Sequence, residues 1–140
     1  ISIGGDGIDF NKLKDLIIEN NLQNHIKLNG FITDTKQFLS DGDLFILPSK
    51  WEGFGLVKLE AMALSLPIIA FNNSSNPETI IENQTGYLIP NNDIQEMANK
   101  IELLFKNPEL KQQLGENNRK LLEEKFNLNV IEQKIINLIN

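Results

Sequence analysis

The most informative segment of the chain is Ser49-Lys50-Trp51-Glu52-Gly53-Phe54-Gly55-Leu56-Val57-Lys58-Leu59-Glu60-Ala61-Met62-Ala63. An apolar run at 44–48 precedes it and is typical of a buried strand, and the residues after Gly55 have a helical pattern. Strand, glycine turn and helix start in succession are typical of phosphate sites in α/β proteins, where free backbone N–H groups and the positive end of the helix dipole bind anions. Carboxylates repel phosphate, so we expect Glu52 and Glu60 to bind another part of the ligand, most naturally sugar hydroxyl groups.

The composition indicates a single globular domain and argues against several functions. The 140 residues include 13 basic and 19 acidic ones, giving a net charge of -6, whereas nucleic-acid binding requires a basic face. There is no cysteine, and the single histidine, His25, falls in a loop, which argues against a metal cluster or a Ser–His triad. No apolar run approaches the roughly 20 residues of a membrane span. Because the chain starts at Ile1, without methionine and already strand-like, we expect it to be part of a longer protein.

Strand-like and helical segments alternate along the chain, which predicts βαβ units and a parallel sheet. We expect strands at 1–4, 26–31, 43–47, 67–71 and 86–89, and helices at 10–21, 34–40, 55–64 and 77–82. Three further helices are expected at about 93–105, 108–126 (broken near Gly115) and 129–139, with apolar positions such as Ile94 and Phe105 covering the sheet. The predicted fold class is therefore α/β, with a Rossmann-like parallel sheet flanked by helices.

Motifs along the chain share an order and spacing with a known family. The central one is Glu52-x7-Glu60, read as Glu-Gly-Phe-Gly-Leu-Val-x-Leu-Glu-Ala-Met-Ala. It is flanked by Gly4-Gly5-Asp6-Gly7, residues 26–31, residues 43–49, Pro67-Ile68-Ile69-Ala70, Pro77-Glu78-Thr79-Ile80-Ile81 and Thr85-Gly86-Tyr87-Leu88-Ile89. Together these motifs resemble the retaining family-4 glycosyltransferases of GT-B fold. The resemblance implies that residues 1–140 are most of the C-terminal, donor-binding domain, truncated at its N-terminal edge.

The resemblance gives each of the two glutamates a role. It implies that Glu60 accepts hydrogen bonds from both ribose hydroxyl groups of a nucleotide, and that Glu52 is the catalytic carboxylate beside the donor sugar. A carboxylate suits a vicinal diol because its two oxygens accept side by side, and hydrogen bonds to a charged group contribute roughly 1.5–3 kcal/mol. Glu52 would also stabilise positive charge at the anomeric carbon, because the transition state is oxocarbenium-like. As ordinary residues, the two glutamates would be solvent-facing or capping carboxylates.

The glycine turn between the glutamates is implied to bind the rest of the donor. The backbone N–H groups of Phe54, Gly55 and Leu56 would contact the sugar and the pyrophosphate. Gly53 and Gly55 would let the main chain approach closely, since glycine has no side chain. The helix dipole adds attraction for the anion.

Other residues are assigned to the site by the same resemblance. Ile32 and Thr33 match the place where such enzymes hold the edge of the base by backbone groups. Lys50 and Lys58 could contact phosphate, although each taken alone is typical of a surface lysine. Trp51 is interpreted as part of the wall or core and not as a stacking platform.

A second helix start is expected on the same crevice. It begins at Asn76, Pro77 and Glu78. Glu78 either contacts the ligand or, as a first-turn residue, only complements the helix dipole.

The implied reaction transfers a sugar from a nucleotide-sugar donor, preferably UDP-linked, to a glycan or lipid-linked acceptor with retention at the anomeric carbon. No cofactor and no metal are implied, because we find no paired-aspartate motif. The family carries an Arg and a Lys just upstream, and an N-terminal acceptor domain, none of which is in this chain. We therefore expect weak nucleotide binding and no turnover by the chain alone. The expected setting is cytoplasmic, at the inner face of the membrane, with no nucleic-acid partner.

Two other functions stay open from the sequence. The chain could be a non-catalytic nucleotide-sugar-binding module or subunit that assembles with a separate acceptor subunit. It could also be a nucleotide-sugar epimerase of the same fold. A preceding acceptor domain in the full reading frame would favour the transferase over the module, and an epimerase would isomerise the sugar without any acceptor.

Overall fold

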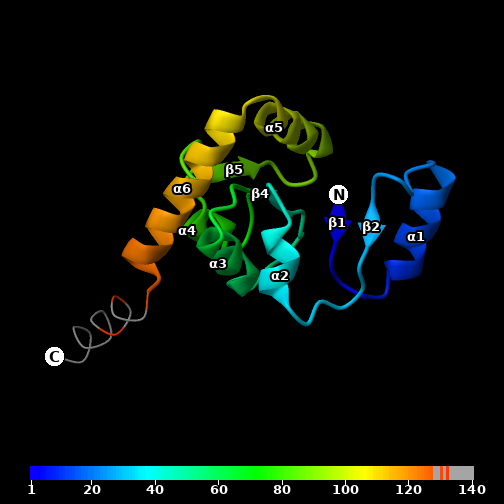
Figure 1. Cartoon of the computed structure of the whole chain (residues 1–140), viewed down its shortest axis with the longest axis horizontal. Coiled ribbons are helices and arrows are strands. Elements are labelled where there is room, and N and C mark those ends of the chain that lie inside the picture. The colour runs from blue at the N-terminus through cyan, green and yellow to red at the C-terminus, as the bar shows by residue number, and fades with distance from the viewer. Residues whose placement is uncertain (128–129, 131, 133–140) are drawn as a thin grey trace. The chain divides into compact units, whose positions relative to one another are not determined.

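The computed structural model describes residues 1–127 together with 130 and 132. The chain divides into two compact units, unit 1 (Ile1–Phe38) and unit 2 (Leu39–Asn140). Strands and helices alternate along the chain as predicted (Figure 1). The helix predicted at 129–139 lies almost wholly outside the described residues.

Unit 1 contains a two-stranded parallel sheet. β1 (Ser2–Ile3) pairs with β2 (Lys27–Leu28), with Ile3 opposite Leu28, and α1 (Phe10–Glu19) connects the two strands. A helical connection is what a parallel pair requires, because a tight turn can join only antiparallel strands. α2 (Thr35–Ser40) follows and crosses the boundary between the units.

Unit 2 is built on a three-stranded parallel sheet in the order β3-β4-β5. Its strands are β3 (Phe45–Leu47), β4 (Ile68–Phe71) and β5 (Gly86–Ile89). All residues of the central strand β4 are buried, which explains its continuous apolar sequence, since a strand covered on both faces needs no polar side chains. The predicted parallel pairing is confirmed in both sheets.

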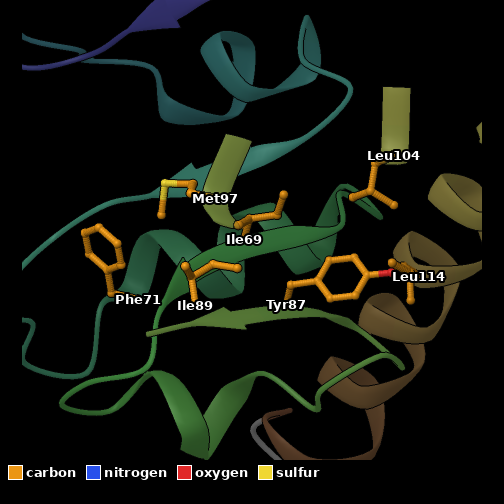
Figure 2. Close-up of a cluster of buried hydrophobic side chains, with 7 residues drawn as sticks. All are labelled: Ile69, Phe71, Tyr87, Ile89, Met97, Leu104 and Leu114. Atoms are coloured by element: carbon orange, nitrogen blue, oxygen red, sulfur yellow. The ribbon is translucent and has the colours of Figure 1, made fainter. Parts of the chain in front are cut away.

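Helices follow each strand of unit 2. α3 (Leu56–Ala63) comes after β3, α4 (Asn76–Thr79) after β4, and α5 (Ile94–Lys106) and α6 (Pro108–Lys125) after β5. α5 packs on β4, β5 and α6 (Figure 1). The core cluster in Figure 2 combines side chains of strands and helices: Ile69, Phe71, Tyr87, Ile89, Met97, Leu104 and Leu114.

Two apolar residues of α5 do not cover the sheet as predicted. Ile94 and Phe105 are 66% and 84% exposed. The core-facing side of α5 is formed instead by Met97, Leu104 and the partly buried Ile101. Phe105 falls outside that spacing, which places it toward solvent. Ile94 keeps the spacing but is the first residue of α5, at the exposed start of the helix.

α6 is continuous through Gly115, so the predicted break there is wrong. A Cβ at Gly115 would lie 1.9 Å from the carbonyl oxygen of Ser65. The missing side chain therefore lets α6 approach the backbone that leads into β4. One turn later, the buried Asn118 donates from Nδ2 to the carbonyl oxygens of Leu66 and Thr85, both at 2.7 Å, and so attaches α6 to the segments that precede β4 and β5.

Candidate functional site

The predicted site lies in unit 2, where the chain passes from β3 into α3. Gly55 precedes α3 with a φ of 70°, in the left-handed region that residues with side chains rarely adopt. No side chain caps α3, and its first turn has no acidic residue. Within the described residues, the N–H groups of Phe54, Gly55 and Leu56 donate to no other protein group. This helix end is therefore open to an anion. We call residues 52–56 the glycine turn.

The two glutamates of the motif both have carboxylates that a ligand can use. Glu52 is half-buried, its N–H donates to Ser74 Oγ at 3.3 Å, and its Oε2 lies 3.5 Å from where a Cβ on Gly55 would be. Glu60 is exposed in α3. Among the residues that the structure describes, neither carboxylate forms an ion pair. Both can therefore accept hydrogen bonds from sugar hydroxyl groups.

Lys58 is wholly buried, so its interpretation as a surface lysine is wrong. Its Nζ donates to Ser75 Oγ at 3.0 Å and to Asn76 Oδ1 at 2.8 Å, at the start of α4. Burial lowers the pKa of Lys58 below its ordinary value of 10.5, and the charges of Glu52 and Glu78 partly oppose this shift. The buried positions 58, 61 and 62 of α3 have helical spacing, which is the signal that places Lys58 on the inner face.

Trp51 and Lys50 lie on the outside of unit 2. Trp51 is 78% exposed, so of the two expected places, the wall of the site or the core, the core is wrong. Lys50 has an exposed side chain, while its carbonyl oxygen accepts from Asn73 Nδ2 at 3.1 Å. Lys50 belongs to one polar region with Asn91, since Asn73 Nδ2 also donates to Asn91 Oδ1. A hollow of about 100 Å³ there is lined by Lys50, Asn73 and Asn91 with Phe71 and Asn92.

Ile32 and Thr33 belong to unit 1, whereas the other predicted site residues belong to unit 2. Ile32 is half-buried against Gly4, because a Cβ on that glycine would lie 2.7 Å from Ile32 Cγ1. Thr33 is exposed and precedes Asp34, whose Oδ1 accepts from the N–H of Gln37 at 2.9 Å at the start of α2. The base-binding role of Ile32 and Thr33 stays a prediction.

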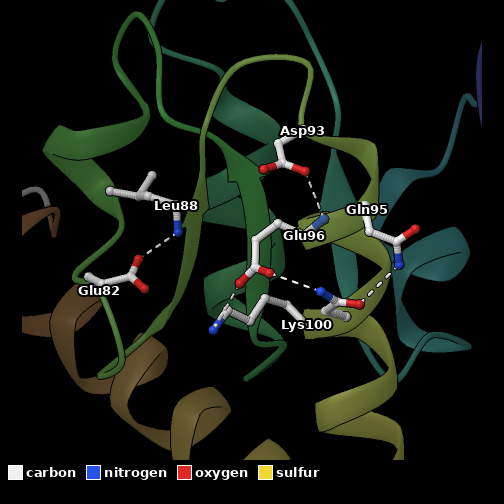
Figure 3. Close-up of polar contacts among 7 residues, drawn as sticks. Glu82, Leu88, Asp93, Gln95, Glu96 and Lys100 are labelled. Atoms are coloured by element: carbon white, nitrogen blue, oxygen red, sulfur yellow. Dashed lines mark hydrogen bonds and ion pairs between the residues drawn. The ribbon is translucent and has the colours of Figure 1, made fainter.

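The start of α5 is built differently, and its acids are engaged within the protein (Figure 3). Asp93 Oδ1 accepts from the N–H of Glu96 at 2.9 Å and caps the helix. Glu96 accepts from Asn99 Nδ2 at 3.0 Å and pairs with Lys100 at 3.3 Å. The hydrogen bond from Asn99, followed by that from Lys100, lowers the pKa of Glu96. These carboxylates hold the helix, and we exclude them from the candidate site.

Residues 1–127, 130 and 132 contain neither a cluster of metal-ligating side chains nor a membrane-spanning helix. No group of three or more His, Cys, Asp or Glu side chains there could hold a metal ion. None of the helices in this part of the chain is both long and apolar enough to cross a membrane.

Comparison with known families decides what this arrangement is. Residues 1–121 match the family described as "Glycosyl transferases group 1". The chain belongs to this family. One relative is the poly(ribitol-phosphate) alpha-N-acetylglucosaminyltransferase of Staphylococcus aureus (strain COL). It is 36% identical over 139 residues, which cover 99% of this chain and 28% of the relative.

Solved glycosyltransferase structures agree with this assignment. A variant of S. aureus TarM in complex with fondaparinux, alpha-GlcNAc-glycerol and UDP matches with a TM-score of 0.89 and 34% identity. That match covers 99% of this chain and 28% of TarM. Anabaena Alr3699/HepE in complex with UDP matches with a TM-score of 0.88 and 26% identity, over 99% of this chain and 40% of the other. The predicted fold class, α/β with parallel strands flanked by helices as in GT-B glycosyltransferases, is confirmed.

Proposed function

We propose that this chain is the donor-binding domain of a retaining, family-4 glycosyltransferase that uses a UDP-linked sugar. The observation that carries the proposal is the open start of α3, where free N–H groups lie in the sequence between Glu52 and Glu60. The UDP bound in the TarM and Alr3699/HepE structures supports this choice of nucleotide. The chain spans 28% of the S. aureus relative, so we assign acceptor binding to a further domain of the whole protein.

The glycine turn binds the diphosphate in this proposal. The N–H groups of Phe54, Gly55 and Leu56 donate to phosphate and sugar oxygens, and Gly53, which is exposed, lets the ligand approach. The positive end of the α3 dipole contributes about 0.3–2 kcal/mol toward the anion. Lys50, whose side chain is exposed, is free to contact a phosphate oxygen.

The two glutamates divide the remaining work. Glu60 is exposed and accepts hydrogen bonds from the ribose hydroxyl groups. Glu52, next to Gly55, binds the donor sugar and stabilises the positive charge that develops at its anomeric carbon. The acceptor hydroxyl oxygen bonds to this carbon from the face that UDP leaves, as the bond from the carbon to the β-phosphate oxygen breaks. UDP departs, and the hydroxyl proton passes to its phosphate oxygen.

The reaction in this proposal needs no metal or other cofactor. The N–H groups of the glycine turn, together with basic residues from a segment outside this chain, neutralise the leaving diphosphate. The chain alone therefore binds nucleotide weakly and does not turn over. The acceptor is a glycan or lipid-linked molecule, and the whole enzyme works on the cytoplasmic side, at the inner face of the membrane.

The test uses the whole protein that contains this chain. The protein is incubated with a UDP-sugar, with and without a glycan acceptor, and the anomeric configuration of the product is read from proton NMR couplings. We expect transfer only with the acceptor, and the donor's configuration in the product. An inverted product would contradict retention, and isomerised donor without acceptor would identify an epimerase. Nucleotide binding without transfer to any acceptor would identify a binding module.

A further inference from the structure

We propose that Lys58 is a positioning residue of the donor site, which acts through Ser75 to hold the Phe54–Gly55 peptide with the Gly55 N–H facing the diphosphate. The inference rests on the proposed function. It gives a role other than the predicted phosphate contact to a buried residue inside the Glu52-x7-Glu60 motif, because the Lys58 ammonium already donates to Ser75 and Asn76.

The Lys58 ammonium has two acceptors that the fold holds in place. Lys58 is wholly buried, and its Nζ donates to Ser75 Oγ at 3.0 Å and to Asn76 Oδ1 at 2.8 Å. The Asn76 carboxamide is itself anchored, because its Nδ2 donates to the carbonyl oxygen of Phe71, at the end of β4, at 2.9 Å. If the buried ammonium moved away from these acceptors, its desolvation cost would no longer be offset by hydrogen bonds. The position of Nζ is therefore strongly favoured.

Ser75 connects the Lys58 ammonium to the glycine turn. Ser75 Oγ accepts from Lys58, so its own hydrogen is directed elsewhere, and it donates to the carbonyl oxygen of Phe54 at 3.1 Å. In a trans peptide the carbonyl oxygen and the following N–H point in opposite directions. Anchoring the Phe54 carbonyl on Ser75 therefore turns the Gly55 N–H away from α4, and this N–H has no partner within the described residues.

The Lys58 side chain also packs against the main chain of the glycine turn. A Cβ on Gly55 would lie 3.0 Å from Lys58 Cε and 3.5 Å from its Nζ. The Lys58 ammonium also lies over the ring of Phe54, with Nζ 5.9 Å from the ring centroid, which is a cation–π contact. The main chain at Phe54 and Gly55 is thus in contact with the stem of Lys58 and is bonded by Ser75, which the ammonium itself holds.

A lysine that only filled space would affect stability and ligand affinity in a different way. Its loss would lower stability and would weaken every ligand of the domain to the same degree. A lysine that orients one phosphate-facing N–H affects ligands with a diphosphate and spares those without one. The comparison of UDP with uridine separates the two roles.

The first experiment needs no ligand and compares Lys58→Met, Ser75→Ala and a control. The control is Lys106→Met, which removes an exposed lysine that pairs with Glu102 at the far end of α5. NMR measures the carbonyl carbon shift of Phe54 and the amide nitrogen shift of Gly55, which report the hydrogen bond to Ser75. We expect both shifts to change in the same direction in the two test variants and not in the control. Unchanged shifts in Ser75→Ala would overturn the inference, and this variant also carries the test if Lys58→Met does not fold.

The second experiment measures the affinities of the same proteins for UDP and for uridine. We expect UDP to bind about tenfold more weakly to both test variants, because one charge-assisted hydrogen bond is misdirected, with uridine and the control unaffected. An equal loss for UDP and uridine would overturn the inference and leave the proposed function standing. A whole wild-type protein that binds neither molecule would overturn the proposed function, and the positioning role of Lys58 with it.

Discussion

The helices α3 and α5 begin in opposite ways, although each follows a parallel strand of the same sheet. α5 starts at Asp93, whose side chain caps it, and has Glu96 in its first turn. α3 starts at Gly55, without a side-chain cap or a first-turn acid, and has the buried Lys58 in its place. The start of α5 thus has a protein acceptor for the N–H of Glu96, whereas the N–H groups of Phe54, Gly55 and Leu56 donate to no protein group in the part of the chain that the structure describes.

We propose that this difference distinguishes the ligand-binding helix of the domain from a helix that only supports the fold. Capping an N-terminus stabilises a helix, so an uncapped end is a local loss of stability. In α3 the loss is confined to the glycine turn, which Lys58, Ser75 and Asn76 hold from below. We infer that the open end has been retained for binding.

The largest effect is expected from Glu52, which has the catalytic role in the proposed function. Glu52→Gln in the whole enzyme should lower the transfer rate about 100- to 1000-fold, the usual effect of removing one group that stabilises transition-state charge. UDP affinity should stay near that of the wild type. Glu60→Ala is the matched contrast and should weaken UDP binding about tenfold or more, because it removes charge-assisted hydrogen bonds. Equal effects of both changes on UDP affinity would contradict this division of roles.

A smaller effect is expected from the left-handed residue before α3. Gly55→Ala should lower the free energy of unfolding by about 1–2 kcal/mol, because φ is 70° and the new Cβ would meet Lys58 Cε at 3.0 Å. Gly53→Ala is the control, since a Cβ there has nothing within 4 Å. Chemical denaturation measures both. Similar changes for the two variants would mean that Gly55 is not strained.

Much of this picture is accessible from the sequence, because it depends on local patterns. The apolar runs predict all the strands, and Gly53 and Gly55 between a strand and a helix predict the turn. Gly115 misled the prediction because a glycine within a helix can interrupt it or allow close packing, and only the Ser65 backbone 1.9 Å from its Cβ position decides which. Ser75 was not predicted at all. Its bond to Lys58 joins residues 17 positions apart, and no periodicity reports such a contact.

The capped start of α5 provides the complementary test. Asp93→Ala removes the cap of α5 and should lower the free energy of unfolding by about 1 kcal/mol, since the N–H of Glu96 loses its acceptor. UDP affinity should not change. Thermal unfolding and a binding titration measure the two quantities. A loss of UDP binding in this variant would mean that the start of α5 belongs to the site.

The smallest effect concerns the pH dependence of Lys58. Its pKa lies below 10.5 in the folded chain, so the unfolded chain binds more protons at this residue as the pH approaches 10.5. Stability contributed by Lys58 therefore rises with pH in that range. The free energy of unfolding of the wild type should increase relative to Lys58→Met as the pH rises toward 10.5, measured by urea denaturation. A difference that falls with pH would show that burial does not depress this pKa.

The central claim is that the start of α3, and not that of α5, receives a nucleotide diphosphate. The direct measurement is an amide NMR titration of the chain with UDP, GDP and ADP in parallel at millimolar concentrations. The account predicts that UDP shifts the amides of Phe54, Gly55 and Leu56 and leaves those at the start of α5 unchanged. Shifts at Asp93 and Glu96, or no shift with any of the three nucleotides, would contradict it.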